Sequence, residues 1–367
     1  MDLIRIRAPR WIAAGLILLL AVLIGRVPSV GAGTAALDVG DQVVVSLIVR
    51  GRGNEVTVRT WERPSVAVEY GDEPPAITHR VTAFGAARGL TLQIPPQLLP
   101  ERPSDPAGSA ALPPEEFPYA AFHPGRHDVV AVDAPQGSHL LVTIPATTGV
   151  LTVRAGGGRT TIDGYHGANL VVIQGQGRVQ LTNASTTAFV QMNYGTFYAA
   201  DDTFERVRVR GIGAHDVFER CRTREIEATS ITGSIVYDAG TFDAGLARFE
   251  SVSGNIALGV TSGAQMTGRA VDGHVYTLFD RRGTPVEQRG DGDASATVAG
   301  GGPVVSAITT RGNVYLYDGS LASHRITTPE WRQVHALFQQ HRTVAPPVPP
   351  APPRMHPERT RQVRLSL

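Results

Sequence analysis

Two adjacent aspartates, Asp201 and Asp202, are the residues whose types and spacing most resemble a catalytic pair. Paired carboxylates can serve as acid and base in glycoside cleavage, and Arg206, Arg208 and Arg210 follow closely, where guanidinium groups can hold the carboxylates of an acidic polysaccharide. Adjacent residues of a strand face opposite ways, so the two aspartates share a face only at a turn. The chain also lacks the NTD, GHG and RIK companions of such enzymes. We therefore expect a solvated turn pair matched to nearby arginines, no catalytic residues, and a protein that is not an enzyme.

The arginines offer a second kind of chemistry. Those at 206, 208 and 210 alternate along one outward strand face, and Arg159 and Arg178 occupy equivalent positions in neighbouring copies of an internal repeat. Such a row can bind an anionic ligand, whereas salt bridges to the two aspartates and to Glu205 explain the row equally well.

No metal or cofactor site is expected. The eleven histidines are scattered, and His335 and His341 are six residues apart, on different faces of a helix. The stretch 290–293, Gly-Asp-Gly-Asp, looks like part of a calcium-binding repeat but occurs once and lacks the nonapeptide pattern. No glycine-rich loop follows a strand and opens a helix, which leaves nucleotide binding without support. The lone Cys221 is expected to be a buried structural thiol.

The internal repeat must position all of these residues. Between Gly149 and Gly319 the sequence contains eight copies of one unit, with a period of about 19 residues. Apolar residues alternate within each copy, as they do in strands with one buried face. In four of the copies the inward positions are Leu151, Val153, Thr160 and Ile162; Leu170, Val172, Val179 and Leu181; Ala247, Phe249, Ile256 and Leu258; and Val305, Ala307, Val314 and Leu316.

Glycine recurs where the two short strands of each copy meet, and it allows the backbone a positive φ there. These corner glycines are Gly158, Gly177, Gly195, Gly233, Gly254, Gly273 and Gly312. The apolar period of two argues against helical repeats, and about 19 residues are too few for a four-stranded propeller blade. The sequence therefore predicts an all-β fold, a parallel β-solenoid of about 19-residue rungs that share a continuous core.

The composition is that of an exported β-rich protein. The 367 residues include 40 glycines and 26 prolines, only 18% are charged, and the net charge of +1 argues against a general nucleic-acid binder. Three arginines precede the apolar run 11–25, whose 15 residues suit a signal peptide and fall short of the roughly 20 that span a membrane. We expect residues 1–35 to be a signal peptide, cleaved after Ala32, or an uncleaved membrane anchor. Either outcome places the body in the periplasm or at the cell surface.

The segments that follow complete the expected domain organisation. Residues 36–94 contain alternating runs and form an opening β block of the solenoid. Residues 95–137 form a proline-rich insertion loop, which is either a binding loop or a loop packed on the body. The repeats then occupy 138–324, with an interruption at 281–302.

The C-terminal part begins with a helix signal. Thr328, Pro329 and Glu330 are typical of a helix start, so residues 325–343 are expected to form a short capping helix. Its apolar stripe would cover the C-terminal end of the repeats and consists of Trp331, Val334, Leu337 and Phe338. Residues 344–367 are expected to be a proline-rich basic tail.

Several stretches resemble one protein family. The run VTVRTWERPSVAVE at 56–69, the VTIP at 142–145 and units of the form V-x-V-x(4)-G-x-V-x-L are similar to those of the bacterial β-strand-repeat adhesins. These are related to adhesin heads with a GIN domain, a domain of unknown function. The closing GGGPVVSAITTRGNVYLYDG at 300–319 also resembles that family's last unit. The resemblance covers residues 41–319 and implies a β-solenoid at the cell envelope that acts in adhesion and carries no catalytic motif. The insertion, the interruption and the C-terminal helix depart from the family's pattern.

Two classes of function fit these features. The first is a non-catalytic binding or adhesion module of the cell envelope, whose partners are envelope or extracellular glycans or proteins. The alternative is a periplasmic structural protein without a specific ligand, held at the inner membrane if the leader stays uncleaved. A third and less supported interpretation is a polysaccharide-active enzyme. No nucleic-acid partner is expected.

Overall fold

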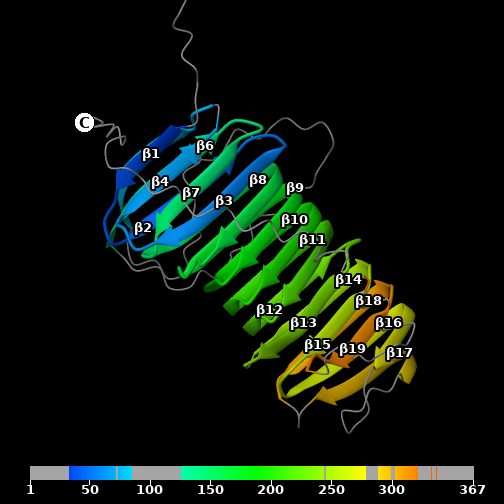
Figure 1. Ribbon diagram of the computed structural model, residues 1–367. Coiled ribbons are helices and arrows are strands. Elements are labelled where there is room, and N and C mark those ends of the chain that lie inside the picture. The colour runs from blue at the N-terminus through cyan, green and yellow to red at the C-terminus, as the bar shows by residue number, and fades with distance from the viewer. Residues whose placement is uncertain are drawn as a thin grey trace, which may run out of the picture.

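The computed structural model describes residues 33–71, 73–84, 125–243, 245–277, 288–298 and 302–320, together with Arg332 and Ala336. Its assigned elements are β-strands, which stack into an elongated body with β1 and β4 near one end and β17 at the other (Figure 1). The strands are β1 (Gly33–Asp38), β2 (Val43–Val49), β3 (Asn54–Trp61), β4 (Ser65–Tyr70), β5 (Ala76–Phe84), β6 (Gly125–Ala134), β7 (His139–Pro145), β8 (Thr148–Asp163), β9 (Asn169–Thr182), β10 (Ser185–Ala200), β11 (Thr203–Glu219), β12 (Arg222–Ser230), β13 (Ile235–Phe242), β14 (Ala247–Ser253), β15 (Ile256–Val260), β16 (Ala264–Thr277), β17 (Gln288–Val298), β18 (Val304–Arg311) and β19 (Val314–Asp318).

The longest strands lie side by side in parallel, one copy of the repeat beside the next. Leu170 of β9 pairs with Leu151 of β8 on one side and with Ala188 of β10 on the other. Ala188 in turn pairs with Val207 of β11. Strands β12 to β15, β18 and β19 continue this parallel ladder in shorter pieces. Residues one repeat period apart in the sequence are therefore paired with one another across neighbouring strands.

The N-terminal strands extend the same arrangement. Val45 of β2 pairs in parallel with Leu151, and Val58 of β3 pairs in parallel with Ile162. On their other edges, β2 pairs with β6 and β3 pairs with β7. The opening block is thus continuous with the repeats.

The predicted corner glycines lie at a bend of each copy, where neighbouring backbones come close. Gly177 and Gly195 have φ values of 108° and 123°, which L side chains rarely adopt. A Cβ at Gly177 would overlap the carbonyl oxygen of Gly158, and a Cβ at Gly195 would overlap that of Gly177. Only glycine combines this φ with this approach, which explains why the residue recurs at the corner.

A second corner uses left-handed residues other than glycine. Asn183, Asp201, Arg220 and Ala239 have φ values between 52° and 59°. They follow one another at equivalent positions, because the N–H groups of Asn183, Asp201 and Arg220 each bond to a carbonyl of the next copy. Asn and Asp tolerate this conformation better than other residues, so this corner has no glycine signature in the sequence.

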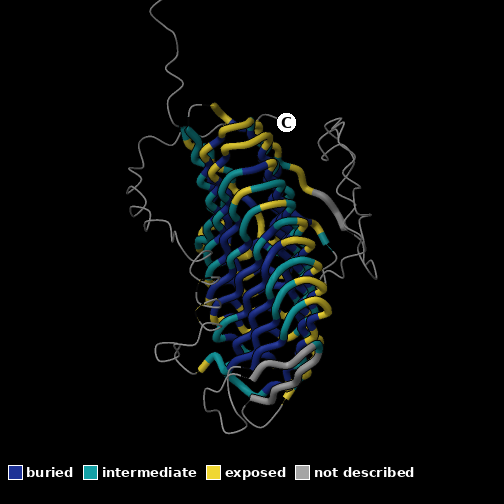
Figure 2. Tube along the Cα trace, turned by 90° about the vertical axis from the view of Figure 1, so that its right-hand side faces the viewer, coloured by how far each residue is buried: buried dark blue, intermediate teal, exposed yellow. Residues whose placement is uncertain are grey.

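The inward side chains form one continuous core. All of the inward residues predicted for the four copies are at most 2% exposed. Figure 2 shows the buried residues running along the length of the body, with exposed residues mainly at its edges. Aromatic rings fill the middle copies, where Phe218 lies 5.5 Å from Phe197 and 5.9 Å from Tyr237 between ring centroids.

The predicted all-β class is confirmed, but the predicted parallel β-solenoid of about 19-residue rungs with a short C-terminal helix is wrong. The described strands belong to one 19-stranded hydrogen-bonded sheet that closes around the core. Extra strands depart from a simple stack, since β1, β5 and β17 pair only antiparallel, with β4, β6 and β16 respectively. The last copy also lies out of order, because β18 pairs with both β14 and β16. The described chain is therefore a closed, mainly parallel β-structure with additional strands.

Other expected segments fall partly or wholly outside the described residues. Residues 125–134, expected in the insertion loop 95–137, form β6, and residues 288–298 of the interruption 281–302 form β17. The expected leader is described only from Gly33, where β1 begins. The expected capping helix 325–343 is not among the assigned elements; the segment is described only at Arg332 and Ala336, each of which has a helical backbone. The basic tail 344–367 lies outside the described residues.

Candidate binding surface

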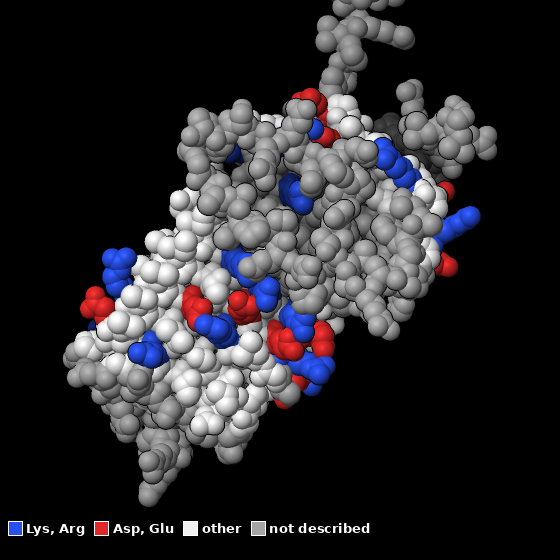
Figure 3. All heavy atoms as spheres, turned by 180° about the vertical axis from the view of Figure 1, so that it is seen from behind, with Lys and Arg blue, Asp and Glu red and all other residues white. Residues whose placement is uncertain are grey.

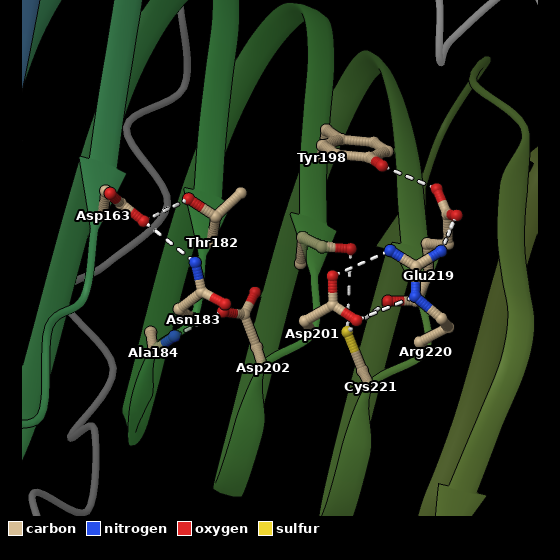
Figure 4. Close-up of polar contacts among 11 residues, drawn as sticks. Asp163, Thr182, Asn183, Ala184, Tyr198, Asp201, Asp202, Glu219, Arg220 and Cys221 are labelled. Atoms are coloured by element: carbon tan, nitrogen blue, oxygen red, sulfur yellow. Dashed lines mark hydrogen bonds and ion pairs between the residues drawn. The ribbon is translucent and has the colours of Figure 1, made fainter. Parts of the chain in front are cut away.

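The structure separates the two aspartates of the sequence-predicted pair. Asp201 lies at the left-handed corner, and its carboxylate accepts two hydrogen bonds from the Arg220 guanidinium, both at 2.7 Å. Asp202 is 1% exposed, and its Oδ1 accepts a hydrogen bond from the backbone N–H of Ala184 at 2.6 Å (Figure 4). Asp201 is thus the expected turn residue matched to an arginine, whereas Asp202 is buried and not solvated. The two carboxyl groups do not face a common substrate site.

Their surroundings push the pKa values of the two carboxyl groups apart. The hydrogen bond from Arg220 lowers the pKa of Asp201. Burial raises the pKa of Asp202 to about 8, and Asp201 and Asp163 raise it further by charge repulsion. Asp202 is therefore mainly protonated at neutral pH, and its Oδ2 has no hydrogen-bond partner.

Cys221 is buried beside these groups, as predicted. It is 1% exposed, and its Sγ lies 3.6 Å from the carbonyl oxygens of both Ala199 and Glu219 (Figure 4). Burial raises the pKa of the thiol, with Asp202 as a smaller contribution. A thiol kept protonated and inaccessible is a poor nucleophile and metal ligand.

The arginine row on β11 is matched to the next strand. Arg206 Nε lies 2.5 Å from Glu225 Oε2, and Arg208 Nε lies 2.8 Å from Glu227 Oε2, both on β12. Seen from behind, acidic and basic side chains lie next to one another in the same way (Figure 3). The expected partners were the two aspartates and Glu205, but Glu205 instead pairs with Arg224. Arg206 and Arg208 of this row therefore form cross-strand ion pairs, whereas Arg210 lies opposite Thr229 in the register.

Arg159 and Arg178 occupy equivalent positions of neighbouring strands, as the repeat predicts. They pair in register across β8 and β9. Burial lowers the pKa of Arg178, and the charge of Arg159 lowers it further. The Arg178 guanidinium also lies 5.8 Å from the ring centroid of Tyr198, a distance at which the ring stabilises a cation.

The described residues contain no group of three or more His, Cys, Asp or Glu side chains that could hold a metal ion. His335, His341 and the side chains of Asp291 and Asp293 lie outside the described set. Within the part of the chain that is described, no helix has the length and apolar character needed to cross a membrane.

The sequence analysis missed an exposed apolar ridge beside the glycine corner. Ile212, Ile231, Val252 and Val271 are 37%, 49%, 45% and 65% exposed. The Thr232 N–H bonds to the Ile212 carbonyl and the Ser253 N–H to the Ile231 carbonyl, so these positions stack from copy to copy. The strand registers place Thr310 between Val252 and Val271. We call the row from Ile212 to Val271 the corner ridge.

The corner ridge borders a hollow of about 1000 Å³. Aliphatic side chains line it at Ile173, Ile212, Ile231, Val252 and Ile308. Polar and charged side chains lie among them, including Gln191, Arg210, Glu227, Thr229 and Glu250. The surface thus offers a line of aliphatic groups with charges of both signs beside it.

A sequence signal for this ridge exists. In three copies an aliphatic residue stands two positions before the corner glycine: Ile231 before Gly233, Val252 before Gly254, and Val271 before Gly273. The corner turns these positions outward, so they cannot belong to the core that the other aliphatic residues form. The sequence analysis considered only the alternating strand positions, so it did not identify these three residues as exposed.

Asp216 is a second residue that sequence reasoning missed. Asp216 pairs in register with Phe197 of β10 on one side and with Ile235 of β13 on the other, at a position that faces the core. The residue is 0% exposed, and neither carboxyl oxygen has a hydrogen-bond partner. Burial raises its pKa well above the usual range. The sequence gives no warning, because the copy at 206–224 is the degenerate one.

Comparison with known proteins gives little guidance. No protein-family model matches the chain, and no curated protein matches it. Among solved structures it is similar to a "putative cell adhesion protein" from Clostridium sporogenes ATCC 15579, with 8% sequence identity and a TM-score of 0.26 over 78% of this chain and 99% of that chain. A likeness at this TM-score carries no argument about function.

Proposed function

We propose that this chain is a non-catalytic binding module of the cell envelope that acts as an adhesin, with the corner ridge and its hollow as the contact surface. The observation that carries the proposal is the row of exposed aliphatic residues from Ile212 to Val271. Contiguous exposed apolar groups rimmed by polar ones mark interaction sites on soluble domains. The resemblance of the chain to bacterial β-strand-repeat adhesins agrees with this proposal.

The lining favours a polypeptide ligand. Aliphatic side chains in a line, with Arg210, Glu227 and Glu250 beside them, suit an extended segment with apolar and charged residues. The lining residues described for the hollow include no aromatic ring on which a sugar could stack. A protein surface is therefore a better match than a glycan.

Two observations argue for a binding module over a polysaccharide-active enzyme. Asp201 is held by Arg220, and Asp202 is buried against Ala184. Arg206 and Arg208, which would have to hold an acidic sugar, are neutralised by Glu225 and Glu227. Catalysis by this pair would require both sets of contacts to break.

The first experiment locates the protein. Intact cells that express the full chain with a tag after Leu367 are treated with protease and compared with cells whose outer layers are permeabilised. Loss of the tag from intact cells supports an adhesin. Protection until permeabilisation contradicts that function and leaves the alternative, a periplasmic structural protein. The intact mass of the protected protein then reports whether the leader is still attached.

The second experiment tests the surface. Purified protein is applied to surfaces coated with extracellular matrix proteins or with purified envelope polysaccharide. We expect Ile231→Ser with Val252→Ser to abolish retention on the protein-coated surface at an unchanged unfolding temperature. Val81→Ser is the matched control, since Val81 is 61% exposed on β5, away from the corner ridge. Equal retention of all variants would exclude the ridge, and retention only on polysaccharide would exclude a polypeptide ligand.

A further inference from the structure

The corner ridge is part of a longer row of residues that face away from the core. The strand registers place Asn193 of β10 beside Ile212, and Gly175 of β9 beside Asn193. Neighbouring members of the row lie roughly 4.8 Å apart, which is the distance between hydrogen-bonded strands. All of them are exposed or half-buried. In the order of the strands, the row consists of Gly175, Asn193, Ile212, Ile231, Val252, Thr310 and Val271. We call it the extended ridge.

A second row runs beside the extended ridge and lines the hollow. In the order of the strands it consists of Ile173, Gln191, Arg210, Thr229, Glu250 and Ile308. We call it the charged row. One buried position separates the two rows on each strand, such as Ser230 between Thr229 and Ile231 on β12 and its end. Because alternate residues of a strand share a face, both rows belong to the same outer surface.

We infer that the partner of this surface is a second copy of the chain, packed face to face with its strand ladder running the opposite way. The inference rests on the proposed function, because it names the partner of the same surface. An extended peptide along the ridge would present same-side residues roughly 6.4–6.8 Å apart and would fall out of step with the ladder. A second stacked β-ladder has the same step of roughly 4.8 Å and stays in register along the whole row.

A two-fold axis parallel to β12 describes the arrangement. Rotation about it keeps each row opposite its own counterpart and reverses the order of the strands, as in an isologous dimer. β12 is the middle strand of the surface, with β11, β10 and β9 on one side and β14, β18 and β16 on the other. Each strand of one copy therefore has a counterpart in the second copy.

The extended ridge is complementary to itself about this axis. Ile231 faces Ile231 of the second copy, and Ile212 faces Val252 of the second copy, so the exposed aliphatic groups cover one another. Toward the ends of the row a polar residue faces a polar one and a glycine leaves room for a valine, in the pairs Asn193 with Thr310 and Gly175 with Val271.

The charged row decides where the axis lies. With the axis over β12, Arg210 of each copy faces Glu250 of the other, so opposite charges meet twice. An axis over β11 or β14 would place one of these residues against its own counterpart, where like charges repel. Arg248 Nε donates a hydrogen bond to Glu250 Oε1 at 2.6 Å within the chain. The Glu250 side chain is still 33% exposed, and a carboxylate can accept a second guanidinium.

Charge reversal in the full chain tests the inference, with sedimentation velocity as the measurement. We expect wild type to dimerise. Arg210→Glu and Glu250→Arg should each weaken the dimer roughly 100-fold or more, because like charges then meet at two places. An equimolar mixture of the two variants should form a heterodimer, in which opposite charges meet again. The double variant should dimerise by itself for the same reason.

Arg80→Glu is the matched control, since Arg80 is exposed on β5, outside the surface, and its reversal should leave the dimer unchanged. Thermal unfolding checks that every variant is folded. A monomeric wild type, or a mixture of the two folded single variants that does not dimerise, would overturn the inference.

Failure of the inference and failure of the proposed function give different results. A monomeric wild type that is retained on matrix proteins through Ile231 and Val252 would overturn the inference and keep the adhesin function, with another protein as the partner. Charge-dependent dimers of a protein whose tag stays protected on intact cells would support the inference and contradict the adhesin function.

Discussion

At the scale of single residues, two buried carboxyl groups are the least expected features of this protein. Asp202 and Asp216 are 1% and 0% exposed, and between them they leave three oxygen atoms without a hydrogen-bond partner. A buried polar group without a partner is destabilising by roughly 1–3 kcal/mol. Asp216 lies on β11, within the copy whose sequence departs furthest from the repeat, and Asp202 lies immediately before that strand. Replacing these carboxyl groups should therefore stabilise the folded protein.

The first prediction concerns Asp216. Asp216→Val should raise the free energy of unfolding at neutral pH by roughly 1–3 kcal/mol, because a side chain of similar shape replaces an unpaired carboxyl between Phe197 and Ile235. Urea unfolding followed by far-UV circular dichroism measures the change. Asp41→Asn, at an exposed position, is the control and should have no effect. A loss of stability in Asp216→Val would mean that the carboxyl has a partner that stabilises it.

The second prediction concerns the pH dependence from Asp202. Its pKa rises from 3.8 to about 8 on folding, so the folded state binds a proton that the unfolded state has released. The wild-type protein should therefore lose stability as pH rises from about 4 to about 8, and the loss should level off above that range. Asp202→Asn removes this titration while keeping an oxygen for the Ala184 N–H.

Unfolding midpoints in urea at several pH values measure the effect. The difference between Asp202→Asn and wild type should grow with pH across that range. Asp201→Asn is the control with the opposite sign, because Arg220 lowers the pKa of Asp201 and its contribution is lost as pH falls. A constant difference between Asp202→Asn and wild type would show that Asp202 does not hold the proton.

At the scale of elements, two kinds of corner determine where the strands bend. One kind is marked by glycine, because neighbouring copies approach too closely for a side chain. The other is left-handed and accepts Asn183, Asp201, Arg220 and Ala239. The first kind leaves a pattern in the sequence, while the second constrains conformation without fixing the residue type.

The third prediction separates two reasons for glycine at the corner: the positive φ of the residue and the close approach of the neighbouring backbone. Gly195→Ala should destabilise the protein by roughly 3 kcal/mol or more, since it adds a clash with the Gly177 carbonyl to an unfavourable φ. Gly137→Ala is the matched control. Gly137 has a φ of 77° but open space around its Cβ position, so only roughly 1 kcal/mol should be lost. Thermal unfolding of both variants gives the comparison, and equal losses would show that the approach of the backbones does not matter.

At the scale of the whole molecule, the copies are joined by a common register. Leu170, Ala188 and Val207 follow one another in a single ladder, and a slip of one residue would turn every core side chain toward water. The contacts of each copy are mainly with the copies next to it, as in other repeat proteins. The number of copies is therefore less constrained than the register between them.

The fourth prediction follows from this register. Deleting residues 187–205 should leave a folded, shorter protein, because Arg206 then takes the place of Thr187 opposite Asn169. Deleting residues 188–205 removes one residue fewer and should abolish cooperative unfolding, since β11 is then shifted by one position. Circular dichroism with thermal melts compares the two. Equal behaviour of both deletions would contradict a core specified by register.

The amino-acid sequence was enough to predict the all-β class, the period and the inward residues. Alternation in copies such as Leu170, Val172, Val179 and Leu181 is a local pattern, and burial of one strand face requires it. The close approach at the corner requires glycine, so that corner was also predictable. The expected solvated turn pair was right for Asp201 only, because Asp202 is buried.

The tertiary structure alone decided how the sheet closes and which surfaces are left over. No local sequence pattern indicates that β18 lies between β14 and β16. None indicates the antiparallel partners of β1 and β17 either. These pairings depend on contacts between segments that are distant in the sequence. The exposure of the corner ridge and the burial of Asp216 have the same origin. Whether a side chain is exposed depends on what the rest of the chain places against it, and a repeat pattern carries no information about that.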